Sequence, residues 1–396
     1  MQAAAWILID RRDGETLAAR APAQRRSIAS ATKLMTAHLA LQNLPLSKRV
    51  RMAPYSAIPG ESLLGVPAGT PISVRDLLFS LILQSGNDAA QTLAVEVAGS
   101  EPAFVARMNR SAAALGLFET HYTNPIGLDS PGNYSSARDL AILADRLLQN
   151  QTFARIADSS TARLGSLQPP LAISSRNTLL LREPWVTGVK TGRTIDAGYV
   201  LVGSGKRKGA ELVSVVLGAP SEGQRDQESL ELLEYGFSRY RIRRPVRARE
   251  IVARTPIRYS GGELPLRASH PITVGVRRGE AVRTSVRAPD EVTGPIRRGR
   301  RLGTIRVVVD GRLAGTAALL AARGIPEASS FDKLKSRPAL LLALIAVAAF
   351  AILVIVWMVR RARRGRGPNG KEMQSSREMR RRDREQRRSD SEGGRR

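Results

Sequence analysis

The sequence predicts an α+β protein that continues into a smaller all-β part, and three observations lead to this fold class. Residues 1–240 keep strand-like and helix-like patterns in separate runs, which favours one antiparallel sheet with helices around it. Residues 241–327 hold short β-rich runs between Gly and Pro turns, as expected for a small β-sandwich domain. Residues 338–359 are apolar and long enough to span a bilayer as one helix.

The first part opens with a predicted β-hairpin and continues into helices. Strand patterns at 4–10 and 16–19 flank Asp13-Gly14, a turn signal. Helical spacing of apolar residues follows at 31–44, 77–83, 89–98, 101–115 and 137–148. Ser73 precedes Asp76 by three residues, which predicts a capped helix start. Residues 50–72 are rich in Pro, Gly and Ser and predict mostly loop.

Further strands and one helix complete the predicted first part. Residues 188–191, 198–203 and 211–217 predict neighbouring strands of the main sheet, and 224–238 predict the closing helix. Residues 169–181 predict an irregular passage that leads into a strand. In the second part, strand patterns occur at 250–253, 272–276, 304–309 and 316–320.

Composition and charge exclude several function classes. The chain has no cysteine and only three histidines, so disulfides, thiolate-bound zinc and a Ser-His-Asp triad are disfavoured. The net charge is +27, and residues 241–320 carry 18 Lys and Arg against 6 Asp and Glu. The basic regions lack interleaved aromatic residues and any nucleic-acid-binding motif, so an anionic lipid or anionic cell-wall polymer is the favoured partner. We expect no nucleic acid, metal or cofactor.

The apolar run at 338–359 predicts a single C-terminal membrane anchor. It follows a linker at 328–337, and the heavier basic side, at 360–396, marks the cytoplasm. Residues 360–396 are rich in Arg, Ser and Glu, which predicts a disordered cytoplasmic tail. The preceding domains, at 1–240 and 241–327, would then lie on the extracytoplasmic side of the membrane. Their export requires a signal peptide, which we expect upstream of the given start.

The central motif of the chain is a Ser-x-x-Lys pair, Ser30 and Lys33, at the start of a helical pattern. Residues three apart share a helix face, so the Lys33 amine can reach the Ser30 hydroxyl. Serine becomes a nucleophile when a base takes its proton, and a lysine is such a base when its pKa is lowered. A helix N-cap is the structural alternative for Ser30. The pair predicts nucleophilic catalysis only with further support.

Two later motifs supply that support. Ser85-Gly86-Asn87 follows an apolar run, and Lys190-Thr191-Gly192 lies in a predicted strand. In this order the three motifs resemble the set of penicillin-binding proteins and serine β-lactamases. The chain further resembles the low-molecular-mass penicillin-binding proteins that are D-alanyl-D-alanine carboxypeptidases of the DacA type. Residues that carry this likeness lie at 6–10, 83–90, 124–129, 134–139, 176–180, 188–194, 303–305, 310–311 and 325–327.

The resemblance implies roles for the site residues. Ser30 would attack the penultimate D-alanine carbonyl, Lys33 would be its base, and Ser85 would pass the proton to the leaving amine. Lys190 would lower the Lys33 pKa by like-charge repulsion. Asn87 would hold Lys33 and bind the peptide group of the substrate. The terminal carboxylate would meet Lys190, Thr191, Thr194 and Arg176, beside Gly192, and the backbone N–H groups of Ser30 and Arg193 would form an oxyanion hole.

The expected activity is release of terminal D-alanine from peptidoglycan stem peptides, with β-lactams as covalent inhibitors. A class A β-lactamase is the nearest alternative, but no Glu-x-x-x-Asn lies between Asn87 and Lys190. A transpeptidase or endopeptidase would use the same residues and stays open. A non-catalytic wall-binding or β-lactam-sensing membrane protein is the alternative from another class.

Overall fold

The computed structural model describes residues 1–259, 261–335 and 337–364, and they fall into two compact units. The first unit holds Met1–Glu250, Ala268–Val286 and Thr304–Ala317. The second unit is made of the remaining segments, and each unit is described by itself. The predicted disordered tail lies outside the described residues from position 365 onward.

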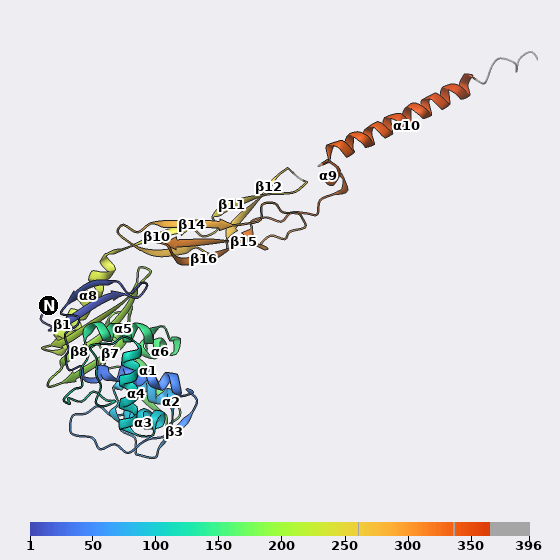
Figure 1. Ribbon diagram of the computed structural model, residues 1–396. Coiled ribbons are helices and arrows are strands. Elements are labelled where there is room, and N and C mark those ends of the chain that lie inside the picture. Colours follow the sequence, from blue (N-terminus) through green and yellow to red (C-terminus); the bar gives the residue numbers. More distant parts are fainter. Residues whose placement is uncertain (260, 336, 365–396) are drawn as a thin grey trace, which may run out of the picture. The chain divides into compact units, whose positions relative to one another are not determined.

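A five-stranded antiparallel sheet forms the centre of the first unit, with strand order β2-β1-β9-β8-β7 (Figure 1). Its strands are β1 (Ala5–Asp10), β2 (Thr16–Arg20), β7 (Val186–Thr194), β8 (Gly198–Arg207) and β9 (Ala210–Ala219). All five were predicted from the sequence, and the three long strands extend beyond the predicted ranges. The β1–β2 turn includes the predicted Asp13-Gly14.

Different helices cover the two faces of this sheet, and each face contributes its own apolar side chains, because successive side chains of a strand point to opposite faces. Leu8 of β1 packs in a cluster with Phe237 of α8 (Glu222–Ser238), which covers one face. Ile7 of β1 and Val213 of β9 belong to the larger cluster on the other face, under the helical layer. The apolar alternation of the strands therefore fixes which face each helix layer covers.

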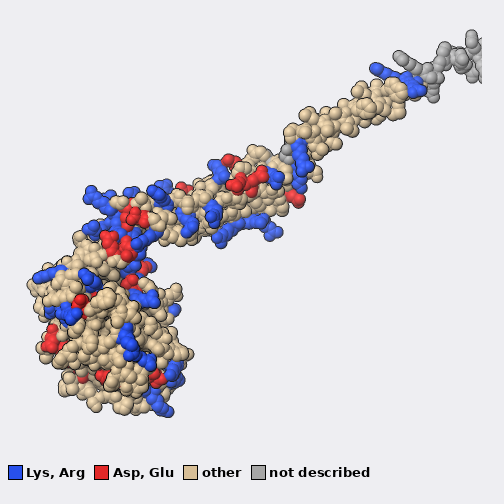
Figure 2. Space-filling model, viewed as in Figure 1, with Lys and Arg blue, Asp and Glu red and all other residues tan. Residues whose placement is uncertain are grey.

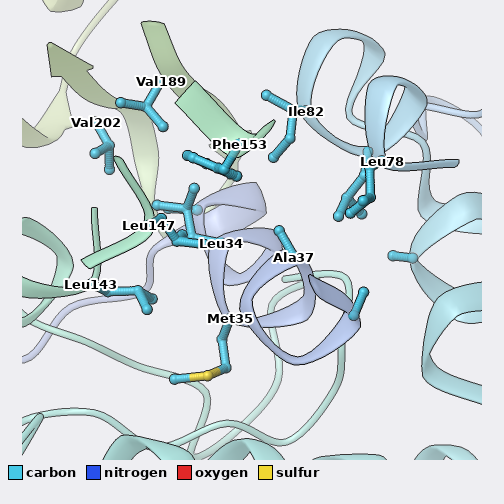
Figure 3. Packing of buried hydrophobic residues seen from close by; sticks show 14 of the residues in the cluster. Leu34, Met35, Ala37, Leu78, Ile82, Leu143, Leu147, Phe153, Val189 and Val202 are labelled. Carbon is cyan, nitrogen blue, oxygen red and sulfur yellow. The ribbon is translucent and has the colours of Figure 1, made fainter. Parts of the chain in front are cut away.

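The helical layer surrounds α1 and supplies most of the core. Its helices are α1 (Lys33–Asn43), α2 (Val74–Phe79), α3 (Asn87–Ala98), α4 (Glu101–Ala114), α5 (Ala137–Leu148) and α6 (Gln151–Ala157), whereas α7 (Leu179–Arg182) buries Leu179 in the cluster that contains Phe237 of α8. Ser73 caps α2 by accepting from the Asp76 N–H, as the sequence predicts. Figure 3 shows Leu34 of α1 beside Leu147 and Phe153, so the helix that begins at Lys33 is held by packing on several sides.

Three short segments differ from the sequence prediction. The passage at 169–181 contains β6 (Leu171–Ser174), which pairs with β5 (Thr161–Leu164), but it ends in α7 rather than in a strand. The predicted loop at 50–72 is bracketed by the paired strands β3 (Arg49–Arg51) and β4 (Pro71–Ser73). Helix α6 was not predicted because it is a short helix with little periodicity, although Asn150 caps it.

Beyond α8 the described chain is mainly β-structure and one long helix. A two-stranded sheet joins β10 (Tyr240–Val246) to β13 (Ile272–Arg277). A five-stranded sheet has the order β11-β12-β16-β15-β14, with β11 (Ile251–Pro256), β12 (Glu263–Ala268), β14 (Val282–Arg287), β15 (Arg301–Val309) and β16 (Arg312–Ala321). The predicted runs correspond to β11, β13, β15 and β16, whereas β10, β12 and β14 were missed.

Two helices close the described chain, α9 (Ser330–Lys335) and α10 (Pro338–Arg364). Among the described residues, α10 is the one helix that is long and apolar enough to cross a membrane. It matches the apolar run from which the sequence predicts a membrane anchor.

Candidate active site

Ser30 lies on η1 (Ala29–Thr32), a 3-10 turn that leads directly into α1. Ser30 does not cap a helix, because η1 begins after Ile28 and α1 begins after Thr32, and neither start has a side-chain cap. The hydroxyl Oγ of Ser30 instead lies 3.0 Å from the amine Nζ of Lys33. Ser30 and Lys33 are therefore in direct hydrogen-bond contact, and Ser30 does not occupy the capping position of the structural alternative.

Lys33 is completely buried, and its amine is in a setting that disfavours positive charge. Burial lowers the pKa of Lys33 to about 7, against the opposing charges of Glu61 and Asp88, and Arg176 lowers it further. The sequence analysis assigned this effect to Lys190, but burial is the largest cause. A lysine with this pKa is neutral in a large fraction of molecules at neutral pH, as a general base requires.

A loop that the sequence analysis quoted only for its family likeness holds the Lys33 amine. Lys33 Nζ donates to the backbone carbonyl of Ile126 at 2.5 Å. Asn124 Oδ1 fixes the loop by accepting from the Gly127 N–H at 2.6 Å. Gly127 has a φ of +86° and no room for a side chain, since a Cβ there would lie 2.0 Å from the Ala29 carbonyl oxygen. The loop is therefore packed against the turn that carries Ser30.

The Lys-Thr-Gly motif lies on β7, directly beside Ser30. A Cβ on Gly192 would lie 2.9 Å from the Ser30 backbone nitrogen, so only glycine allows this approach. Lys190 is buried and donates to the Thr191 carbonyl at 2.7 Å. Burial, and then the charge of Lys33, lowers the pKa of Lys190 well below its ordinary value. The edge of the sheet thus meets the turn that bears the predicted nucleophile.

The side chains of Arg193 and Thr194, the two residues after Lys-Thr-Gly, have different surroundings. Arg193 is exposed, and its guanidinium stacks over the ring of Tyr199 at 5.2 Å. Thr194 Oγ1 accepts from the Ala197 N–H at 3.2 Å in the turn between β7 and β8. The structure therefore shows a partner for both side chains, whereas the predicted oxyanion role of Arg193 involves only its backbone N–H.

Ser85 and Asn87 follow a π-helical turn, η2 (Ser80–Gln84), that extends α2. Ser85 has a φ of +65°, and its buried hydroxyl has no hydrogen-bond partner among the described residues. An orphaned buried hydroxyl costs free energy unless a ligand or water completes it, which is typical of functional sites. Asn87 donates through its side-chain amide to Glu61 at 2.7 Å.

Glu61 is a site residue that the sequence analysis missed. Its carboxylate accepts from Asn87 and from the Tyr55 hydroxyl. Burial raises the Glu61 pKa, but these hydrogen bonds outweigh it and leave the pKa below its ordinary value. Glu61 is the only charged residue between Arg51 and Arg75, and this isolated charge in a predicted loop was the signal available in the sequence.

Arg176 comes to the site from the segment between β6 and α7. Its backbone N–H donates to the Leu83 carbonyl at 3.0 Å, beside the Ser85 segment. Its exposed guanidinium lies close enough to lower the pKa values of both Lys33 and Lys190. The structure therefore brings together a hydroxyl, two buried lysines and an exposed guanidinium. Among the described residues no cluster suited to a metal ion occurs.

Comparisons with known proteins agree with this geometry. Residues 1–221 match the family D-alanyl-D-alanine carboxypeptidase, and residues 240–327 match the C-terminal domain of penicillin-binding protein 5. The carboxypeptidase DacF of Bacillus subtilis is 30% identical over 84% of this chain and 88% of its own length. The solved penicillin binding protein 5 from Haemophilus influenzae is 29% identical, with a TM-score of 0.58 over 83% of this chain and 98% of that one. The solved Streptomyces K15 DD-transpeptidase is 30% identical, with a TM-score of 0.57 over 60% of this chain and 98% of that one.

Fold and comparisons together define a serine-type hydrolase with a penicillin-binding-protein-like fold and a C-terminal β domain. The carboxypeptidase family accounts for more than half of the chain. The chain belongs to the D-alanyl-D-alanine carboxypeptidase family, which confirms the resemblance found in the sequence.

Proposed function

We propose that the protein removes the terminal D-alanine from peptidoglycan stem peptides through an acyl-enzyme on Ser30. The observation that carries this proposal is the 3.0 Å approach of Lys33 Nζ to Ser30 Oγ, together with the complete burial of Lys33. A hydroxyl beside a neutral amine is an activated nucleophile, and such a pair can serve amide hydrolysis without a metal or organic cofactor.

In the acylation step the neutral Lys33 amine accepts the Ser30 proton while one of its N–H groups stays on the Ile126 carbonyl. Ser30 Oγ bonds to the penultimate D-alanine carbonyl carbon, and the amide C–N bond breaks. Ser85 passes the proton on to the leaving amine, which departs as D-alanine. Water then adds to the ester carbonyl, the Ser30 oxygen leaves with a proton, and the shortened peptide is released.

The negative oxygen of each tetrahedral intermediate would lie between the backbone N–H groups of Ser30 and Arg193. The close approach of Gly192 to the Ser30 nitrogen supports this assignment, because it brings the end of β7 to the Ser30 N–H. Each such donor stabilises the transition state by about 3–4 kcal/mol. The substrate carboxylate would meet Lys190, Thr191, Thr194 and Arg176, a cationic and hydroxyl-bearing set that suits a free chain end.

We place this activity outside the cytoplasm, on a membrane-anchored protein. Helix α10 is long and apolar enough for one span, and arginines follow its apolar stretch. The excess of arginine at that end favours a cytoplasmic location for it, so the catalytic unit would face the cell wall.

The test is an intact mass of the full chain in detergent after exposure to penicillin. A β-lactam imitates the D-Ala-D-Ala end, so we expect one stable adduct that Ser30→Ala abolishes and the nearby control Ser27→Ala retains. Release of D-alanine from a peptide ending in D-Ala-D-Ala should follow the same pattern. Rapid loss of the antibiotic without a lasting adduct would instead indicate a β-lactamase, and neither result in a folded sample would indicate a binding protein.

A second candidate is a transpeptidase, favoured by the similarity to the Streptomyces K15 DD-transpeptidase. The same acyl-enzyme would then pass to an amine in place of water. Adding glycine as an acceptor separates the two functions. Growth of a glycine-terminated product at the expense of the hydrolysed peptide would favour the transpeptidase.

A further inference from the structure

A large cavity in the first unit is lined by arginines that the proposed reaction does not use. The lining comes from the residues around β10, from the end of β13 with the turn that follows it, and from the start of β14, and it includes seven arginines and one glutamate. Its volume is about 1370 Å³. Small-molecule pockets usually measure about 300–1,000 Å³, so the cavity can hold a stretch of polymer or a large anion.

Most of these arginines have no carboxylate partner. Within the part of the chain that the structure describes, no ion pair involves the following six of them: Arg239, Arg241, Arg243, Arg244, Arg247 and Arg278. All six are exposed, and the space-filling view shows basic side chains gathered over the β-rich part of the chain (Figure 2). A recess lined by one sign of charge focuses its potential and attracts counter-ions.

Arg277 differs from the other arginines of the cavity because its guanidinium forms ion pairs with carboxylates. Its guanidinium binds Glu280 at 3.0 Å and Asp13 at 2.6 Å, and Glu280 also pairs with Arg12 at 2.6 Å. The Glu280 carboxylate is thus already shared by two cations. The single acidic residue of the lining is therefore not free to neutralise the six exposed arginines, and an external anion can do so.

The chemistry of the lining selects among anions. Guanidinium groups bind phosphate oxygens in a bidentate way, and several in a row suit a chain of phosphate groups. Among the described residues no aromatic side chain lines the cavity, so nucleic acid bases would find no ring there to stack on. Ile242 is the exposed apolar residue of the lining, whereas Pro245 and Val282 are partly buried and Val276 is buried, so one apolar side chain is available for insertion into a lipid layer.

We propose that the arginine-lined cavity between β10 and the β13 end binds a linear phosphodiester polymer of the cell wall, and so holds the enzyme beside its peptidoglycan substrate. This inference rests on the proposed function for the location of the catalytic unit at the wall. The polymer contacts would be ionic and bidentate, one phosphate to one or two guanidinium groups.

The test measures binding of fluorescent poly(glycerol phosphate) of defined length to the full chain in neutral lipid nanodiscs, at several salt concentrations. The variant Arg241→Gln/Arg243→Gln/Arg244→Gln removes three cavity charges without removing a described side-chain contact. We expect it to weaken binding about tenfold or more and to lower the slope of log affinity against log salt by about two to three. The matched control Arg297→Gln/Arg298→Gln/Arg300→Gln removes three exposed charges outside the cavity and should change affinity less than about twofold.

The inference is wrong if the unaltered chain does not bind the polymer, or if both triple variants weaken binding equally. It is also wrong if the chain binds poly-glutamate of matched charge with the same affinity as poly(glycerol phosphate), or if phosphatidylglycerol vesicles at matched phosphate displace the polymer. That displacement would indicate a lipid surface as the occupant. Penicillin acylation of the cavity variant is measured in parallel and should be unchanged. Loss of acylation in the unaltered chain would contradict the proposed function, whereas loss of polymer binding alone contradicts only this inference.

Discussion

The pH dependence of acylation gives the sharpest test of Lys33 as the base. With a Lys33 pKa of about 7, the neutral fraction of the amine is about one tenth at pH 6 and about nine tenths at pH 8. The second-order rate of penicillin acylation should therefore rise about tenfold between these pH values and then level off. An ordinary lysine, of pKa 10.5, would be neutral in only about 0.03% of molecules at pH 7 and would give a rate still rising at pH 9.

Two charge-removing variants should move this profile in opposite directions. Glu61 raises the Lys33 pKa and Arg176 lowers it, so Glu61→Gln should shift the midpoint to lower pH and Arg176→Gln to higher pH. Glu96→Gln, on the outer side of α3 and paired with Lys48, removes the same charge away from the site and should leave the midpoint unchanged. Rapid-quench mass spectrometry of the adduct gives the rates. A flat profile, or shifts of one sign for both variants, would refute the role of Lys33.

Three further predictions follow from the packing of the site. The folded-state pKa of Lys33 lies below its unfolded value, so the unfolded chain binds more protons between pH 7 and 10.5 and stability rises with pH there. Lys33→Met should therefore raise the melting temperature most at pH 6 and progressively less toward pH 10, and a pH-independent difference would contradict the burial argument. Gly192→Ala places a Cβ 2.9 Å from the Ser30 nitrogen and should slow acylation about a hundredfold, measured by adduct formation. Gly127→Ala should lower the free energy of unfolding by more than about 3 kcal/mol in urea titrations; Gly132→Ala, at the same φ of +86° but with no atom closer than 3.5 Å, should cost only about 1 kcal/mol.

Local sequence patterns predicted those parts of the fold in which apolar residues are buried and polar residues are exposed. The strands of the main sheet alternate so that Leu8 and Ile7 face different layers, and that alternation is visible in the sequence. The start of α2 was predicted because Ser73 is both a preferred cap residue and an observed one. β10 was missed because its four consecutive exposed residues, Arg241 to Arg244, interrupt the alternation expected of a strand, so its pattern resembled a basic connection.

The contacts that tune the site were harder to predict, since they join segments that are distant in sequence. Three motifs located Ser30, Lys33 and Lys190, but no local pattern shows that a backbone carbonyl at Ile126 would receive the lysine amine. Such a contact depends on main-chain geometry, which the identity of the side chain does little to predict. The same holds for Glu61, whose importance follows only from the fold that brings its loop to Asn87.

The strength of the base therefore depends on a loop as well as on burial. The Glu61 loop is fastened to the start of α3, where Asp88 accepts from the backbone N–H groups of Leu64 and Gly65 at 2.8 and 2.9 Å. Because Glu61 opposes the effect of burial on Lys33, the position of this loop contributes to how far the Lys33 pKa falls. A loop held less firmly would remove a compensating negative charge and leave the amine neutral but a weaker base. The hydrogen bonds that Asp88 accepts thus connect the stability of a surface loop to the basicity of the buried Lys33.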